Sequence, residues 1–227
     1  MAFKRYRLNR RVIQDLKKRS TIGIAFYLVV VWLVLFADGY YYRNPAFARE
    51  FFFWVSLICL FRLIHLAVAH WCRDRFETIN NWIFLVSVAL TGLIWGVGFA
   101  IFLLHDGEAS PRFLMTVCSI GLCSGGVVAF IPDVRLCLVF LFSLLMPADL
   151  TLFFTGRDMP LAIAILMFAV YLSFIAVRGN REYWDALENE HLLDIRSQEL
   201  ERLSRIDSLT SLFNRRCFDE VYHKEWH

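Results

Sequence analysis

The chain has 227 residues, of which 58% are hydrophobic and 20% charged, and its formal net charge is +3. Soluble globular domains contain about 45–50% apolar residues, so this composition excludes an ordinary soluble domain and predicts a membrane protein. Because every backbone amide in lipid must be paired internally, we expect the membrane part to be all-α.

Residues 1–20 form a basic segment that we expect to lie in the cytoplasm. Its eight cationic residues are Lys4, Arg5, Arg7, Arg10, Arg11, Lys17, Lys18 and Arg19. Such charges orient the span that follows them, and they also attract anionic lipid head groups. Since orientation already explains these charges, we expect no nucleic-acid partner.

Six apolar runs approach the length of about 20 residues that a helix needs to cross a bilayer. They lie at residues 21–37, 51–70, 82–104, 113–131, 136–154 and 161–177. We therefore expect a six-helix transmembrane domain over residues 21–177, embedded in the lipid bilayer. No A-x-A-like cleavage site follows the first run, which we interpret as a permanent anchor and not as a signal peptide.

The distribution of lysine and arginine predicts the orientation of this domain. Thirteen of these residues lie before the first span or in alternate connections, and four lie in the other connections. This bias places both termini in the cytoplasm. The longest outward loop, residues 38–50, has only thirteen residues, so we expect a small-molecule or membrane signal of unknown identity to act on the bundle, the lipid or these short loops.

Two pairs of glycines four residues apart lie in the third and fourth spans. They are Gly92 with Gly96, and Gly121 with Gly125. Small residues at this spacing allow helix backbones to approach closely in lipid. We expect the two pairs to pack these helices against each other or across a dimer.

Arg62, His65 and Asp149 are the polar residues that form our candidate signal pocket. Arg62 lies about twelve residues into the second span, where a charge costs roughly 2.5–3.5 kcal/mol, and such residues usually face the bundle interior. His65 shares its helix face, and Asp149 is the one acidic residue well inside an apolar run. In the alternative interpretation the second span begins earlier and Arg62 extends to the cytoplasmic head groups.

The cysteines and histidines predict no metal site. The six cysteines show no C-x-x-C motif and no Cys/His spacing typical of zinc sites. None lies in an outward loop, so disulfides are not expected. Haem would need two histidines at the same depth, and only His65 is clearly embedded.

Residues 178–206 are polar but rich in helix formers. Ala186, Leu193 and Leu200 recur every seven residues, and Leu203 follows three further on. This spacing is typical of one seam of a coiled coil. We expect a signalling helix that forms a parallel homodimer, although Asn189 and Arg196 interrupt the seam. A solvated linker helix is the alternative.

The most specific motif follows this helix, at residues 206–218. The sequence there reads Ile-Asp-Ser-Leu-Thr-Ser-Leu-Phe-Asn-Arg-Arg-Cys-Phe. It resembles the start of the GGDEF domain of bacterial diguanylate cyclases, whose signature is D-x-L-T-x-L-x-N-R-R. The matching residues are Asp207, Leu209, Thr210, Leu212, Asn214, Arg215 and Arg216. Ser211 stands where the family most often has glycine.

The resemblance implies that residues 207–227 are the truncated start of an α/β GGDEF domain. The complete parent would condense two GTP into cyclic di-GMP with Mg²⁺, at the bacterial inner membrane. Phosphoryl chemistry needs metal-binding carboxylates, and the family's GG[DE]EF loop is not found here: Gly125-Gly126 is the one Gly-Gly pair, and it continues Val-Val-Ala-Phe. We therefore expect this chain to be inactive alone, with no catalytic residue, cofactor or metal of its own.

Two other classes of membrane protein remain open. A histidine-kinase sensor would share this design, and His191 lies in a suitable helix, but the acidic residue and downstream proline of a phospho-acceptor motif do not accompany it. A transporter would need only the six spans with Arg62 and Asp149, and would leave the C-terminal motif unexplained.

Overall fold

The computed structural model describes residues 2–37, 39–71, 77–105 and 109–205, together with residues 212, 214, 218 and 222. All the regular structure in these residues is helical. The helices are α1 (Ala2–Phe36), α2 (Tyr40–Arg43), α3 (Pro45–Trp71), α4 (Glu77–Leu104), α5 (Ala109–Phe130), α6 (Val134–Thr155) and α7 (Met159–Arg205).

Six of these helices are long and apolar enough to cross a membrane. Their apolar stretches are Arg11–Phe36, Pro45–Ala69, Thr78–Leu104, Ala109–Phe130, Val134–Thr155 and Met159–Leu200. Each overlaps one predicted span, which confirms an all-helical, multi-pass bundle. The expected α/β start of a GGDEF domain at residues 207–227 lies almost entirely outside the described residues.

The first outward connection contains a helical turn that the sequence analysis missed. Gly39 adopts φ 66°, a conformation that glycine reaches without strain, and α2 follows directly. The Asn44 backbone N–H then donates to the carbonyl of Tyr40 at 2.9 Å. Helix α3 begins at Pro45, which fits a first helical position because its missing N–H is not needed there.

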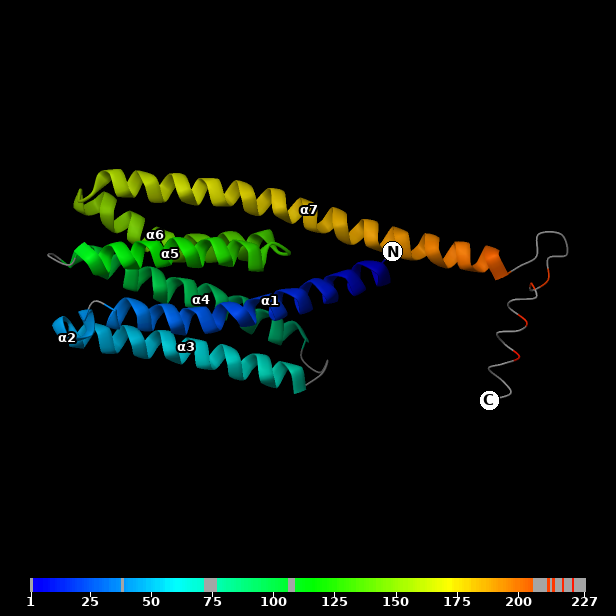
Figure 1. Cartoon of the computed structure of the whole chain (residues 1–227), viewed down its shortest axis with the longest axis horizontal. Helices are drawn as coiled ribbons and strands as arrows, with labels where there is room; N and C mark the ends of the chain where they lie inside the picture. Colours follow the sequence, from blue (N-terminus) through cyan, green and yellow to red (C-terminus); the bar gives the residue numbers. More distant parts are fainter. Residues whose placement is uncertain are drawn as a thin grey trace. The chain divides into compact units, whose positions relative to one another are not determined.

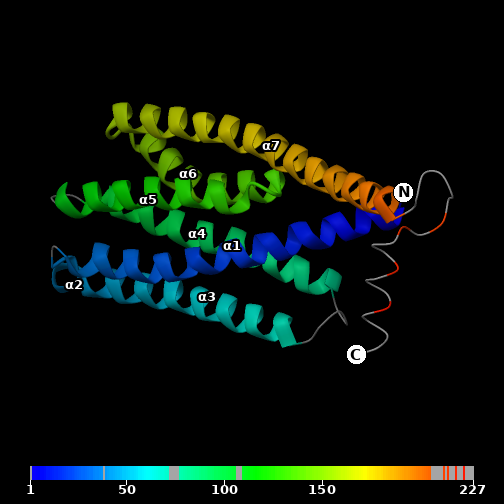
Figure 2. The same ribbon diagram turned by 45° about the vertical axis from the view of Figure 1, so that its right-hand side comes forward.

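The chain divides into two compact units, Met1–Asn180 and Arg181–His227. In the first unit, α1, α3, α4, α5 and α6 run side by side (Figures 1 and 2). Helix α4 lies at the centre of this bundle and contacts α3, α5 and α6. Its apolar stretch is accordingly the most buried of the six.

Helices α4 and α6 make the closest contact in the bundle. A Cβ atom on Gly96 would lie 2.6 Å from the carbonyl oxygens of Ser143 and Leu144, and one on Gly92 would collide with the Ser143 hydroxyl. Pro147 has no N–H to offer the Ser143 carbonyl four residues earlier. That carbonyl instead faces the Gly96 backbone.

The second glycine pair does not behave as expected. A Cβ atom on Gly121 or Gly125 would meet nothing within 4 Å. The prediction that these residues pack the third and fourth spans closely was therefore wrong within one chain, and packing across a dimer stays a prediction. Gly92 and Gly96 do pack closely, but against the fifth span.

An aromatic core joins α1, α3, α4 and α5. Trp95 is fully buried, and its Nε1–H donates to the Ser119 hydroxyl at 2.9 Å. Its ring meets Tyr27 edge-on and Phe51 at a tilt, both at a centroid distance of 5.5 Å. Ser119 in turn donates to the Met115 carbonyl at 2.7 Å, so the Trp95 indole and the Ser119 hydroxyl are both hydrogen-bonded.

Candidate functional site

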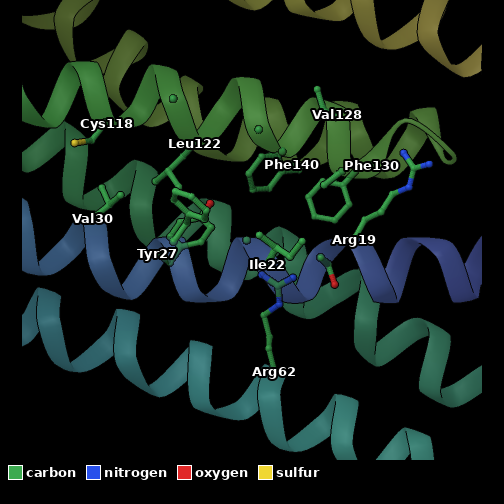
Figure 3. Close-up of a pocket in the computed structure, with 17 residues that line it drawn as sticks. Arg19, Ile22, Tyr27, Val30, Arg62, Cys118, Leu122, Val128, Phe130 and Phe140 are labelled. Atoms are coloured by element: carbon green, nitrogen blue, oxygen red, sulfur yellow. The ribbon is translucent and has the colours of Figure 1, made fainter.

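A cavity of about 590 Å³ lies between α1 and α5, with α3 and α6 contributing to its walls. Figure 3 shows Tyr27 from α1 and Arg62 from α3 at this cavity, opposite Leu122 and Phe130 of α5. Most of the lining is apolar, since it includes three glycines of α5 and several aliphatic and aromatic side chains. A volume of this size falls in the range of small-molecule sites.

Arg62 is the most unusual residue in the lining. Its side chain is only 3% exposed, and its Nη1 donates to the Thr91 hydroxyl at 3.3 Å. Thr91 itself donates to the Ser87 carbonyl at 2.7 Å, which leaves the oxygen lone pairs for the arginine. The guanidinium therefore points into the bundle, as expected for a charge within a span. The second span begins at Pro45, earlier than residue 51, as the alternative interpretation supposed.

The α3 face on either side of Arg62 explains this orientation. Phe61, Leu63 and Ile64 are 48%, 41% and 53% exposed, so they form the lipid-facing side of α3. Arg62 and Cys59 lie on the opposite side and are both buried. Helix periodicity thus aims the arginine at α4 and α1.

Tyr27, like Arg19 and Ser20, adds a polar group to the lining of the cavity. It is 4% exposed, and its hydroxyl has no hydrogen-bond partner within the described part of the chain. Arg62 is close enough to Tyr27 and Cys59 to interact with them electrostatically. Among the lining residues that the structure describes, no side chain carries a carboxylate.

The other two residues of the expected signal pocket do not line this cavity. His65 is 9% exposed and stacks on Phe61 at a centroid distance of 6.3 Å, near Lys17 and Asn80. Asp149 is 4% exposed in α6. Asp149 Oδ1 and His65 Nε2 have no hydrogen-bond partner among the described residues. Of the three candidates, only Arg62 lines the cavity.

Sequence reasoning missed Tyr27, Gly121 and Gly125 as cavity residues. The two glycines were noticed, but their spacing was interpreted as helix packing. A tyrosine within an apolar run carries no charge cost that would single it out. Nothing in the sequence alone places α1 against α5.

The described residues contain no group of three or more His, Cys, Asp and Glu side chains that could hold a metal ion. Cys59, Cys118, Cys123 and Cys137 have free thiols. His105 Nδ1 lies 2.8 Å from the Ile101 carbonyl, one turn earlier in its helix. Cys72 and Cys217 lie outside the described residues.

Near its middle, where the apolar part ends, α7 is hydrogen-bonded to the turn between α5 and α6. The Asn180 side-chain amide donates to the carbonyls of Ile131 at 2.7 Å and Pro132 at 3.1 Å. A Cβ atom on Gly179 would lie 3.1 Å from the Ile131 side chain. The turn continues into Asp133, which caps α6 by accepting from the backbone N–H groups of Arg135 and Leu136.

This turn directly follows the α5 wall of the cavity. Phe130, the last residue of α5, lines the cavity, and Ile131 is its neighbour in the chain. Helix α7 continues without a break from Met159 to Arg205, through the sixth span and the predicted signalling helix. One short turn therefore connects the cavity wall at Phe130 with the part of α7 around Asn180.

The expected coiled-coil seam lies on α7. Ala186, Leu193 and Leu200 are exposed, the leucines by 65% and 67%. The Leu203 side chain is not among those that the structure describes. In the C-terminal motif, Leu212 is exposed and Asn214 half-buried. Asp207, Leu209, Thr210, Arg215 and Arg216 lie outside the described residues.

No protein family, curated protein or solved structure matches this chain.

Proposed function

We propose that this chain is the membrane sensor module of a signalling protein of the diguanylate cyclase type. In this proposal the bundle receives a signal within the membrane, and α7 carries it to a GGDEF domain that makes cyclic di-GMP from two GTP with Mg²⁺. The D-x-L-T-x-L-x-N-R-R motif at residues 207–216 supports the identity of that domain. The excess of lysine and arginine on one side supports cytoplasmic termini at a bacterial inner membrane.

The observation that carries the proposal is the continuity of α7. A helix that begins as a membrane span at Met159 and continues as a polar helix to Arg205 can transmit movement or rotation along its axis. Asn180 lies where the apolar part ends, and it holds the α5–α6 turn by two hydrogen bonds. A change in α5 thereby reaches α7 through one contact.

A signal can act through this contact only if it binds two arrangements of the bundle with different affinity. The cavity on α5 is the place where such a difference can arise. A ligand that separates α1 from α5, or draws them together, would displace the turn that Asn180 holds. The exposed seam of Ala186, Leu193 and Leu200 would then set how two copies of α7 lie together.

The test joins the full chain at its C-terminal end to the catalytic domain of a soluble diguanylate cyclase and measures cyclic di-GMP in bacterial cells. We expect Asn180→Ala to change output at least about twofold, because it removes two hydrogen bonds worth about 1 kcal/mol each. Glu188→Ala, an exposed residue two turns further along α7, is the matched control and should leave output unchanged.

Equal output from Asn180→Ala and the parent fusion would contradict the role of the turn. A fusion that is folded and inserted yet makes no cyclic di-GMP in any variant would contradict the proposed function itself. In that case the end of α7 would lie on the side of the membrane that lacks GTP.

A further inference from the structure

The cavity between α1 and α5 has the shape of a site for a lipophilic molecule. Gly121 and Gly125 form an open floor along α5, where added Cβ atoms would meet nothing within 4 Å. Gly23 of α1 lines the same space and is equally open. The rest of the wall is mostly apolar, with side chains such as Ile22, Val30 and Leu122, and Arg19 and Ser20 of α1 also line it (Figure 3).

The hydrogen-bond donors that line the cavity favour an anionic ligand. A guanidinium has five N–H donors and no acceptor. Within the described residues, Arg62 uses one of these donors, in its hydrogen bond to Thr91. The buried Tyr27 hydroxyl offers a further donor with no partner in the described part of the protein. With no carboxylate among the described lining residues, the positive charge of Arg62 is not neutralised by the cavity wall.

We propose that this cavity binds an amphipathic carboxylate of the fatty-acid class, with the carboxylate on Arg62 and Tyr27 and the apolar chain along Gly121 and Gly125. A carboxylate is planar and matches the guanidinium fork, and such charge-assisted pairs are the strong ones in a medium of low dielectric. This inference depends on the geometry of the cavity and not on the function proposed for α7.

The depth of Arg62 favours a fatty acid over an anionic phospholipid. Arg62 lies nine residues before Trp71, the last residue of α3, which corresponds to about 14 Å along the helix. To reach Arg62, a phospholipid would have to draw its bulky phosphodiester head group that far from the interface, and a head group held at Arg19, which also lines the cavity, would leave Arg62 without an anion. A fatty acid needs to bring only its carboxylate, whose two oxygens the available donors can satisfy.

The test uses the full chain in nanodiscs of phosphatidylcholine, under mildly alkaline conditions, with a palmitate probe that carries a photoreactive diazirine on its chain. Labelled residues are mapped by mass spectrometry. We expect labelling of α1 and α5 around Ile22, Gly121 and Gly125, and unlabelled palmitate should suppress it. Methyl palmitate should compete at least about tenfold less well, since loss of one charged hydrogen bond has that effect. Added phosphatidylglycerol should also compete poorly, because its head group would have to leave the interface to reach Arg62.

Three variants test the two halves of the site. Arg62→Gln and Tyr27→Phe should each raise the palmitate concentration needed for competition, the first by about tenfold or more. Gly121→Leu should fill the cavity and abolish the labelling that palmitate suppresses. Arg49→Gln is the matched control: Arg49 lies on the same helix, is exposed, and does not line the cavity.

Equal competition by methyl palmitate would overturn the proposal in favour of a neutral lipophile. Equal competition by phosphatidylglycerol would overturn it in favour of a lipid head group. An equal loss of competition in Arg49→Gln and Arg62→Gln would show that the charge acts generally and not at this site. If Arg62→Gln does not fold, Tyr27→Phe and Gly121→Leu still decide the question.

Discussion

Buried polar side chains in this bundle fall into two groups, and the difference predicts opposite effects of substitution. Trp95 and Thr91 have their hydrogen bonds, whereas the Tyr27 hydroxyl has no partner among the described residues. A buried hydroxyl without a partner costs about 1–3 kcal/mol. We therefore expect Tyr27→Phe to stabilise the ligand-free protein by about 1 kcal/mol while keeping the edge-on contact with Trp95. Thermal unfolding in detergent measures this.

Trp95→Phe is the counterpart to that substitution. It removes the hydrogen bond to Ser119 and leaves unfilled space in the aromatic core, so we expect it to destabilise the protein by about 2 kcal/mol. If Tyr27→Phe also lowered the unfolding temperature, the hydroxyl would have a partner in the folded protein, and its availability to a ligand would be contradicted.

The sequence identified one cavity residue for a physical reason and could not identify the others. Arg62 stands out because a charge in an apolar run is costly, and the structure shows it buried as that cost implies. The proposed partnership with His65 and Asp149 depended on which helices are neighbours, and hydropathy carries no such information. Tyr27 matters only because α1 packs near α3 and α5, which no pattern within α1 reveals.

At the scale of helices, the two glycine pairs differ in a way that substitution can measure. Alanine at Gly96 would place its Cβ 2.6 Å from backbone carbonyls of α6, which cannot move without shifting the helix. We expect Gly96→Ala to destabilise the bundle by about 1–3 kcal/mol, the usual cost of overpacking. Gly121→Ala should be neutral or slightly stabilising, because alanine has the higher helix propensity and its Cβ meets nothing within 4 Å.

Both variants can be compared by unfolding in the same detergent. Equal destabilisation would mean that Gly121 also packs closely, as its spacing first predicted.

Hydropathy and glycine spacing differ in how much of the fold they can predict. Hydropathy was sufficient to locate six spans, because the bilayer imposes a length on every helix. Glycine spacing indicates close approach but does not name the partner helix, so α6 was missed as the partner of Gly92 and Gly96.

At the scale of the whole molecule, the proposed sensor function requires two copies of α7 to lie together, and the sequence predicts a parallel dimer. Ala186, Leu193 and Leu200 form an exposed apolar seam on α7 in a single chain, and a second copy would bury it. We expect Leu193→Cys and Leu200→Cys each to give same-position disulfides on mild oxidation in membranes. Gln198→Cys, on the side of the helix away from the seam, should give little more than the unsubstituted chain.

Equal crosslinking at Gln198 and Leu193 would indicate random collision and would favour a solvated linker helix. Absence of crosslinks at Leu193 and Leu200 would exclude a parallel seam. A graded result would be the most informative, since Asn189 and Arg196 interrupt the seam and keep its stability low. If palmitate altered the ratio of the Leu193 to the Leu200 crosslink, binding at the cavity and the arrangement of two α7 helices would be coupled. That coupling is what a sensor requires and what a transporter does not need.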